Sequence, residues 1–117
     1  MKKINVLKNS YDFTRIIKNN KPFKYKYYVI YLERCDQDNY KFGLSVGKKI
    51  GNAVIRNKYK RRLREIISQK DYQKNFNCII ILSRDVLNKT YQEMNEDLIH
   101  SFEKLNIIKE KSNEKQK

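Results

Sequence analysis

The sequence predicts an α+β fold with the element order αββαβα. Two observations support this prediction: three short segments are rich in aromatic and β-branched residues, and three others repeat apolar residues at the helical period. The two kinds of segment are interleaved along 117 residues, the length of one ordinary domain. We therefore expect a single domain over residues 1–109, built as a sandwich of helices and sheet.

The first helix is predicted to follow the N-cap candidates Asn9-Ser10. Phe13, Ile16 and Ile17 recur at helical spacing, so one side of this helix is apolar. Pro22 marks the limit of the pattern. A short amphipathic helix results.

Two strands are predicted next, over residues 27–32 and 40–46. In the first strand, alternation places Tyr28, Ile30 and Leu32 on one face and Tyr27, Val29 and Tyr31 on the other. The polar stretch 36–39 between the strands is typical of a turn. We therefore expect the two strands to form a β-hairpin.

The second half of the chain contains two helices and one strand. The longer helix is predicted over residues 52–67, with a buried stripe formed by Ile55, Tyr59, Leu63 and Ile66. The β-branched run within 76–82 is typical of a strand covered on both faces, and this strand should pair with the hairpin.

The last helix begins with a capping-box pattern formed by Thr90 and Glu93. Its apolar stripe consists of Met94, Leu98, Phe102 and Leu105. The tail at 110–117 has no apolar anchor, and we expect it to be disordered.

The charge of the chain favours a polyanionic partner. It carries 27 Lys and Arg against 13 Asp and Glu, a formal net charge of +14, and nucleic acid is the leading candidate. The longest apolar run, at 79–82, is far shorter than the roughly 20 residues of a membrane-spanning helix. The N-terminus lacks the apolar stretch of a signal peptide, so we expect a cytoplasmic protein without membrane contact.

The residues that usually carry chemistry are sparse. Cys35 and Cys78 lie far apart, and only His100 could join them as a ligand, so we expect neither a metal site nor a disulfide. His100 has no nucleophile or carboxylate partner that the sequence identifies. We therefore expect no catalytic residue in the protein and assign no metal ligand directly.

The strongest functional signal is a basic block. Between Asn39 and Arg64 there is no acidic residue. The candidate nucleic-acid-binding residues of this block are Lys48, Lys49, Asn52, Arg56, Asn57, Lys58, Lys60, Arg61, Arg62 and Arg64. At 100° per residue, a basic face forms away from the apolar stripe, composed of Arg56, Asn57, Lys60, Arg61 and Arg64. Arginine suits this role because its planar fork binds phosphate oxygens in pairs.

The glycines at 43 and 47, followed by lysines, invite comparison with a phosphate-binding P-loop. The glycines are one residue too close, and Lys49 stands where a P-loop has Ser or Thr. No acidic strand follows to hold magnesium. We therefore do not expect nucleotide hydrolysis.

Residues 42–64, FGLSVGKKIGNAVIRNKYKRRLR, closely resemble the signature of the bacterial ribonuclease P protein family. Arg56-Asn57-Lys58 is similar to the Arg-Asn-Arg motif of that family. The resemblance extends to Phe13 in the first helix, to the aromatic strand near Tyr31, and to the last strand and helix. It implies a ribosomal protein S5 domain 2-like fold with a left-handed βαβ crossover around the basic helix.

The resemblance also implies a division of labour. In this family the catalytic RNA, which holds most of the Mg²⁺, removes the 5′ leader of precursor tRNA. The basic helix would dock on the ribonuclease P RNA and help to organise its metal ions. The leader would lie in a cleft between the first helix and the sheet, where the candidate residues are Phe13, Tyr27, Tyr31, Lys41 and Ser45. No protein partner is implied.

Two questions stay open at this point. Phe13 is suited equally to the core and to a stacking platform, and the small residues Gly43 and Ser45 would leave room for an RNA strand. A ribosomal or other translation-associated RNA-binding protein, or a DNA-compacting protein, would show a similar composition. The nucleic acid that co-purifies with the chain distinguishes these functions.

Overall fold

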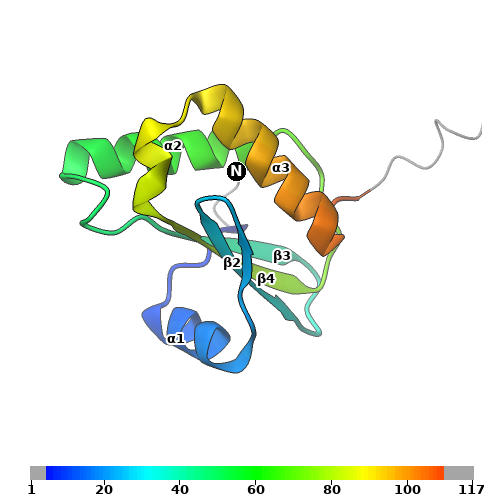
Figure 1. Ribbon diagram of the computed structural model, residues 1–117. Helices are drawn as coiled ribbons and strands as arrows, with labels where there is room; N and C mark the ends of the chain where they lie inside the picture. The colour runs from blue at the N-terminus through cyan, green and yellow to red at the C-terminus, as the bar shows by residue number, and fades with distance from the viewer. Residues whose placement is uncertain (1–4, 110–117) are drawn as a thin grey trace, which may run out of the picture.

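The computed structural model describes residues 5–109, so the tail predicted to be disordered lies outside the described residues. The elements in chain order are α1 (Ser10–Asn19), β1 (Phe23–Tyr25), β2 (Tyr28–Arg34), β3 (Tyr40–Ser45), α2 (Ala53–Ile67), β4 (Phe76–Leu82), the 3₁₀ helix η2 (Arg84–Asn88) and α3 (Tyr91–Leu105). All six predicted elements are present, with β1 and η2 in addition. Figure 1 shows α1 on one side of the sheet and α2 with α3 on the other. The predicted α+β fold is confirmed.

The sheet has the order β1-β2-β4-β3, with β4 antiparallel to β2 and parallel to β3. The predicted hairpin between β2 and β3 is therefore wrong, because β4 lies between them. In a strand that is buried on both faces, the backbone N–H and C=O groups need hydrogen-bond partners, which a neighbouring strand on each edge provides. The backbone of Asn75 leads into this arrangement: its N–H donates to the carbonyl of Asn39 (2.8 Å), and its carbonyl accepts from the N–H of Cys35 (3.0 Å).

The hairpin that does form joins β1 and β2. Phe23 pairs with Ile30 and Tyr25 with Tyr28. The turn places Lys26 at a φ of 57°, and Tyr27 lies in this turn rather than in the strand. A three-residue strand carries too little alternation to be recognised in the sequence.

The main core lies between the sheet and the helices α2 and α3. From α2 it contains Tyr59, Leu63 and Ile66, as predicted. Ile55 was expected in the same stripe, but its side chain is 37% exposed. In the first turn of the helix it packs on the backbone of Gly51 instead, where an added Cβ would lie 2.9 Å from its Cγ2 atom.

The predicted capping box of α3 is confirmed. The N–H of Glu93 donates to Oγ1 of Thr90 (3.1 Å), and the N–H of Thr90 donates to Oε1 of Glu93 (2.8 Å). This backbone hydrogen bond to the carboxylate holds the pKa of Glu93 below its usual value. Within residues 5–109 no helix combines the length and the apolar character needed to cross a membrane.

Candidate nucleic-acid interface

The basic helix α2 is started by a turn and a side-chain cap. The N–H of Gly51 donates to the carbonyl of Lys48 (3.1 Å), which closes the turn after β3. Oδ1 of Asn52 then accepts from the N–H of Ile55 (3.1 Å), so Asn52 is the N-cap of the helix. Its side-chain oxygen has a structural task, which the sequence analysis had not assigned.

The cationic side chains of this region divide into two groups. Those exposed are Lys48, Lys49, Lys58, Arg61 and Arg64, and the neutral Asn57 between them is exposed as well. Arg56, Lys60 and Arg62 are half-buried. The first turn of α2 contains no acidic residue, so the partial positive charge of the helix N-terminus adds to the field of the lysines.

Arg62 points toward α3 rather than away from the protein. Its guanidinium carbon lies 5.2 Å from the ring centroid of Tyr59, and its Nη1 lies 3.8 Å from Sδ of Met94. Arg56 differs again, because its Nε is buried and has no hydrogen-bond partner in the described part of the chain. No acceptor within residues 5–109 offsets the cost of burying this donor.

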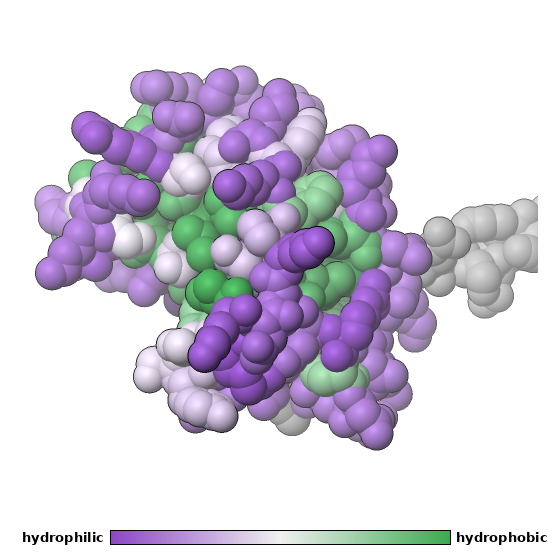
Figure 2. Space-filling model, turned by 60° about the horizontal axis from the view of Figure 1, so that its bottom comes forward, coloured by the Kyte–Doolittle hydropathy of each residue, from purple (hydrophilic) through white to green (hydrophobic). Residues whose placement is uncertain are grey.

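On the opposite side of the sheet, strand register builds a surface beside α1. One row across the strands contains Lys24, Val29, Ile81 and Ser45. The next row contains Tyr31, Ile79 and Gly43. Viewed toward this side, the molecule shows hydrophobic surface in the middle, surrounded by hydrophilic residues (Figure 2).

Helix α1 packs on the second of these rows. Ile16 forms a buried cluster with Ile79, and half-buried Phe13 and Tyr31 pack against that cluster. A Cβ added to Gly43 would lie 2.5 Å from Cζ of Phe13, so the ring fills the space above this glycine. The room that the sequence suggested for RNA above Gly43 is therefore occupied. The first row is the more open one, because Val29, Ile81 and Ser45 are only half-buried.

One of the predicted leader-binding residues lies elsewhere. Tyr27 is 2% exposed and packs in the main core, on the α2 and α3 side, where its hydroxyl donates to Oδ2 of Asp97 (2.6 Å). Burial and this carboxylate raise the pKa of Tyr27. Tyr27 was predicted on the same face as Val29 and Tyr31, but it lies in the β1–β2 turn, one residue before the strand, and its side chain points to the other side. Lys41 lies on the same face of the sheet as Ser45, in a third row with Glu33 and Asn77.

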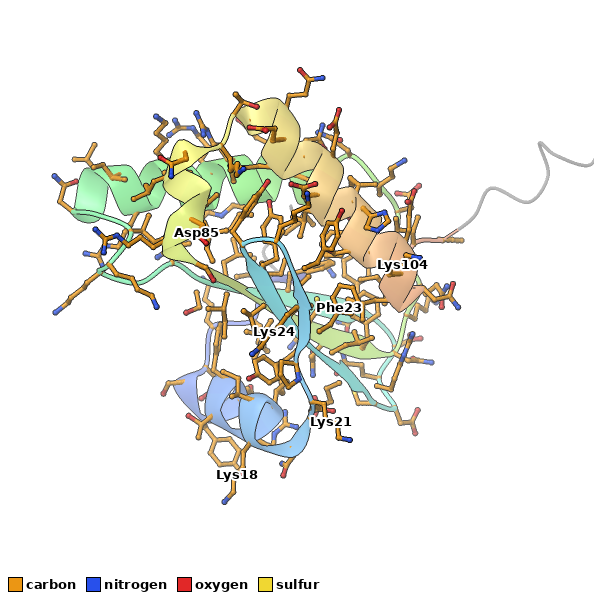
Figure 3. The ribbon with its side chains drawn as sticks, in the orientation of Figure 1. Lys18, Lys21, Phe23, Lys24, Asp85 and Lys104 are labelled. Atoms are coloured by element: carbon orange, nitrogen blue, oxygen red, sulfur yellow. The ribbon has the colours of Figure 1, made fainter. Side chains whose placement is uncertain are left out.

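Several residues of this side were missed by the sequence analysis. Lys24 belongs to the open row only because β1 pairs with β2, and β1 was not predicted. Lys18 at the end of α1, Lys21 and Lys24 follow one another along the same side of the molecule (Figure 3). Val29 and Ile81 lie within apolar strand patterns, and nothing in the sequence distinguished them from the buried core residues of the same strands.

The two candidate surfaces meet at the outer edge of β3. A cavity of about 270 Å³ there is lined by Phe13 of α1, by Leu44 of β3, and by Lys60 and Arg64 of α2. Val6, Leu7 and Lys8 complete its wall. An apolar floor with three cations around it suits a nucleotide phosphate together with the face of a base.

A direct metal site in the protein does not fit the residues present. In the described range 5–109, no three His, Cys, Asp or Glu side chains come close enough to hold an ion. Cys35 is half-buried and Cys78 is buried, and burial raises the pKa of both thiols. These cysteines are therefore poor ligands and poor nucleophiles.

Comparison with known proteins gives a consistent result. Residues 1–106 match the family described as Ribonuclease P. The ribonuclease P protein component of Streptococcus pyogenes is 41% identical over 101 residues, covering 86% of this chain and 85% of the relative. That of Bacillus cereus is 36% identical over 117 residues, covering 96% of this chain and 97% of the relative.

Solved structures agree with the sequence matches. The RNase P protein of Staphylococcus aureus superposes with a TM-score of 0.78 at 28% identity, covering 90% of this chain and 98% of that chain. The RNase P protein of Thermotoga maritima gives a TM-score of 0.73 at 27% identity, covering 80% of this chain and 91% of that chain.

Proposed function

Because this chain belongs to the ribonuclease P protein family, we propose that it binds a catalytic RNA and assists it in removing the 5′ leader of precursor tRNA. The observation that supports this most directly is the cavity shared by Phe13, Lys60 and Arg64, which connects the α1 side of the sheet with the basic helix. A connected surface of this kind suits a protein that holds two RNA elements next to each other. The family match over residues 1–106 sets aside the ribosomal alternative raised by composition.

In this proposal the basic helix α2 docks on the catalytic RNA. Its exposed cations, Lys58, Arg61 and Arg64, contact phosphates, and each contact releases counterions from the RNA. The Mg²⁺ ions of the reaction are held mainly by the RNA, since residues 5–109 bring no three His, Cys, Asp or Glu side chains together. The protein contributes positive charge and helps to position the RNA.

The leader lies across the open row of the sheet. Val29 and Ile81 form its apolar floor, Lys24 stands at one end, and Ser45 stands at the other. With neighbouring strands about 4.8 Å apart, the row is roughly 14 Å long. Beyond Ser45 the chain continues into the basic turn with Lys48, so the path leads directly to the RNA-docking helix.

Tyr31 tests whether a base stacks beside this row. Tyr31→Ala in the reconstituted holoenzyme should weaken binding of leader-bearing precursor by about tenfold, since a stacked base contributes roughly 1–3 kcal/mol. Tyr31→Phe keeps the ring and should bind almost as well as the wild type. Mature tRNA has no leader and serves as the control ligand. Equal losses for precursor and mature tRNA, together with a lower melting temperature, would mean that Tyr31 only supports the sheet.

Lys24 tests the direction of the path. It lies at the end of the row far from the basic turn, so Lys24→Ala should weaken binding of precursors with long leaders and leave short leaders unaffected. The slope of log K against log salt should fall by about 0.7 for the long leaders alone, as expected for one lost contact to a single strand. The same loss at every leader length would place Lys24 outside the path.

A further inference from the structure

The N-terminal tip of α2 exposes apolar side chains. Val54 is 77% exposed, more than any other large hydrophobic residue in the described part of the chain. Its neighbour Ile55 is 37% exposed. Together these two residues form an apolar tip at the start of an otherwise basic helix.

The surroundings of this apolar tip are positively charged. In a helix, residues three, four and seven positions further on lie on the same side, which for Val54 are Asn57, Lys58 and Arg61. All three are exposed. The turn before the helix adds Lys48 and Lys49, and the first turn contains no acidic residue. An apolar contact ringed by cations suits a polyanion that also presents an apolar face.

Only some RNA segments have this property. In a continuous RNA helix the faces of the bases are stacked and hidden, whereas in loops, bulges and junctions they are open. A phosphate backbone alone would favour another lysine at position 54, not a valine. The apolar tip therefore matches an unstacked nucleotide better than it matches a regular duplex.

We propose that Val54 and Ile55 pack against the face of an unstacked base in the catalytic RNA, while Lys58 and Arg61 hold the phosphates on either side. This inference rests on the proposed function and adds a second kind of contact to it. The charged residues supply attraction that weakens with salt. The apolar tip supplies a contact that depends little on salt and selects an irregular RNA site.

Substitutions at Val54 distinguish the two kinds of contact. The full-length chain is titrated with a bacterial ribonuclease P RNA, transcribed in vitro, at several salt concentrations. Val54→Ala removes two methyl groups from the contact and should weaken binding by about tenfold, with an unchanged salt slope. Val54→Lys should also weaken binding. Tighter binding by Val54→Lys with a steeper salt slope, or unchanged binding by Val54→Ala, would overturn the inference.

A matched control separates this result from general effects. Leu87 in η2 is 41% exposed and lies outside the basic helix, so Leu87→Ala should bind the RNA like the wild type. Melting temperatures of all variants show whether the fold is kept. If the wild-type chain itself does not bind the RNA, the proposed function fails. If the wild type binds and Val54→Ala binds equally well, only the role of the apolar tip fails.

Discussion

The contact between α1 and Gly43 makes a sharp prediction. A Cβ added at this position would lie 2.5 Å from Cζ and 3.0 Å from Cε1 of Phe13, and 3.2 Å from Cδ2 of Leu7. Separations below 3.0 Å between non-bonded carbons require a shift of the neighbours. Gly43→Ala must therefore displace the ring of Phe13 from its place above the sheet.

The magnitude follows from two opposing effects. Overpacking of this kind costs about 1–3 kcal/mol of unfolding free energy. Replacing glycine by alanine also restricts the unfolded chain, which stabilises the protein by about 0.4–1 kcal/mol. The net loss for Gly43→Ala should be about 1–2 kcal/mol. For a domain of this size, each kcal/mol corresponds to a melting temperature about 4–8 °C lower.

Urea denaturation of four proteins tests the cause: the wild type, Gly43→Ala, Phe13→Ala and the double variant. The penalty of Gly43→Ala should disappear in the Phe13→Ala background, because the ring that the new methyl displaces is gone. Additive losses in the double variant would refute the reasoning. So would a Gly43→Ala protein that is as stable as the wild type.

Three further predictions concern other parts of the molecule. Arg61→Ala should flatten the salt slope of RNA binding by about 0.7–0.9 without a change in stability, whereas Arg62→Ala should lower the unfolding free energy by about 0.5–1 kcal/mol because it loses its aromatic contact. If Arg61→Ala instead lowered the stability and Arg62→Ala flattened the salt slope, Arg62 would be the RNA contact and Arg61 the packing residue. Thr90→Ala should cost about 1 kcal/mol in denaturant titrations, and Thr90→Ser should restore most of it. An alkylating reagent followed by mass spectrometry should modify Cys35 slowly in the native protein and Cys78 only after unfolding; equal native rates would contradict the burial of Cys78.

The helices could be predicted from the sequence because their signals are local. The cap at Thr90 and the stripe of Leu63 and Ile66 act within a few residues, and the structure contains both. The two strands of the false hairpin were also placed well. Their pairing was not, because a turn-like stretch at 36–39 indicates a reversal of the chain and says nothing of a third strand that can enter between the two.

The site shows the same limit. The basic residues of α2 follow one another along the chain, so the sequence showed them together. The α1 side draws its residues from four strands and a helix, and Lys24, Val29 and Ile81 become neighbours only through register. Tyr27 was assigned to the wrong face because a shift of one residue at the start of a strand reverses the side chain.

The central position of β4 has a consequence for how the chain folds during synthesis. β4 is the last strand to leave the ribosome, yet it is hydrogen-bonded to both β2 and β3. Until residue 82 has emerged, β2 and β3 have no neighbour between them, and each exposes an unpaired edge. A growing chain cannot complete its sheet strand by strand from the N-terminus. Folding of this domain must wait for most of the chain and then proceed by pairing distant segments, which is a slow route.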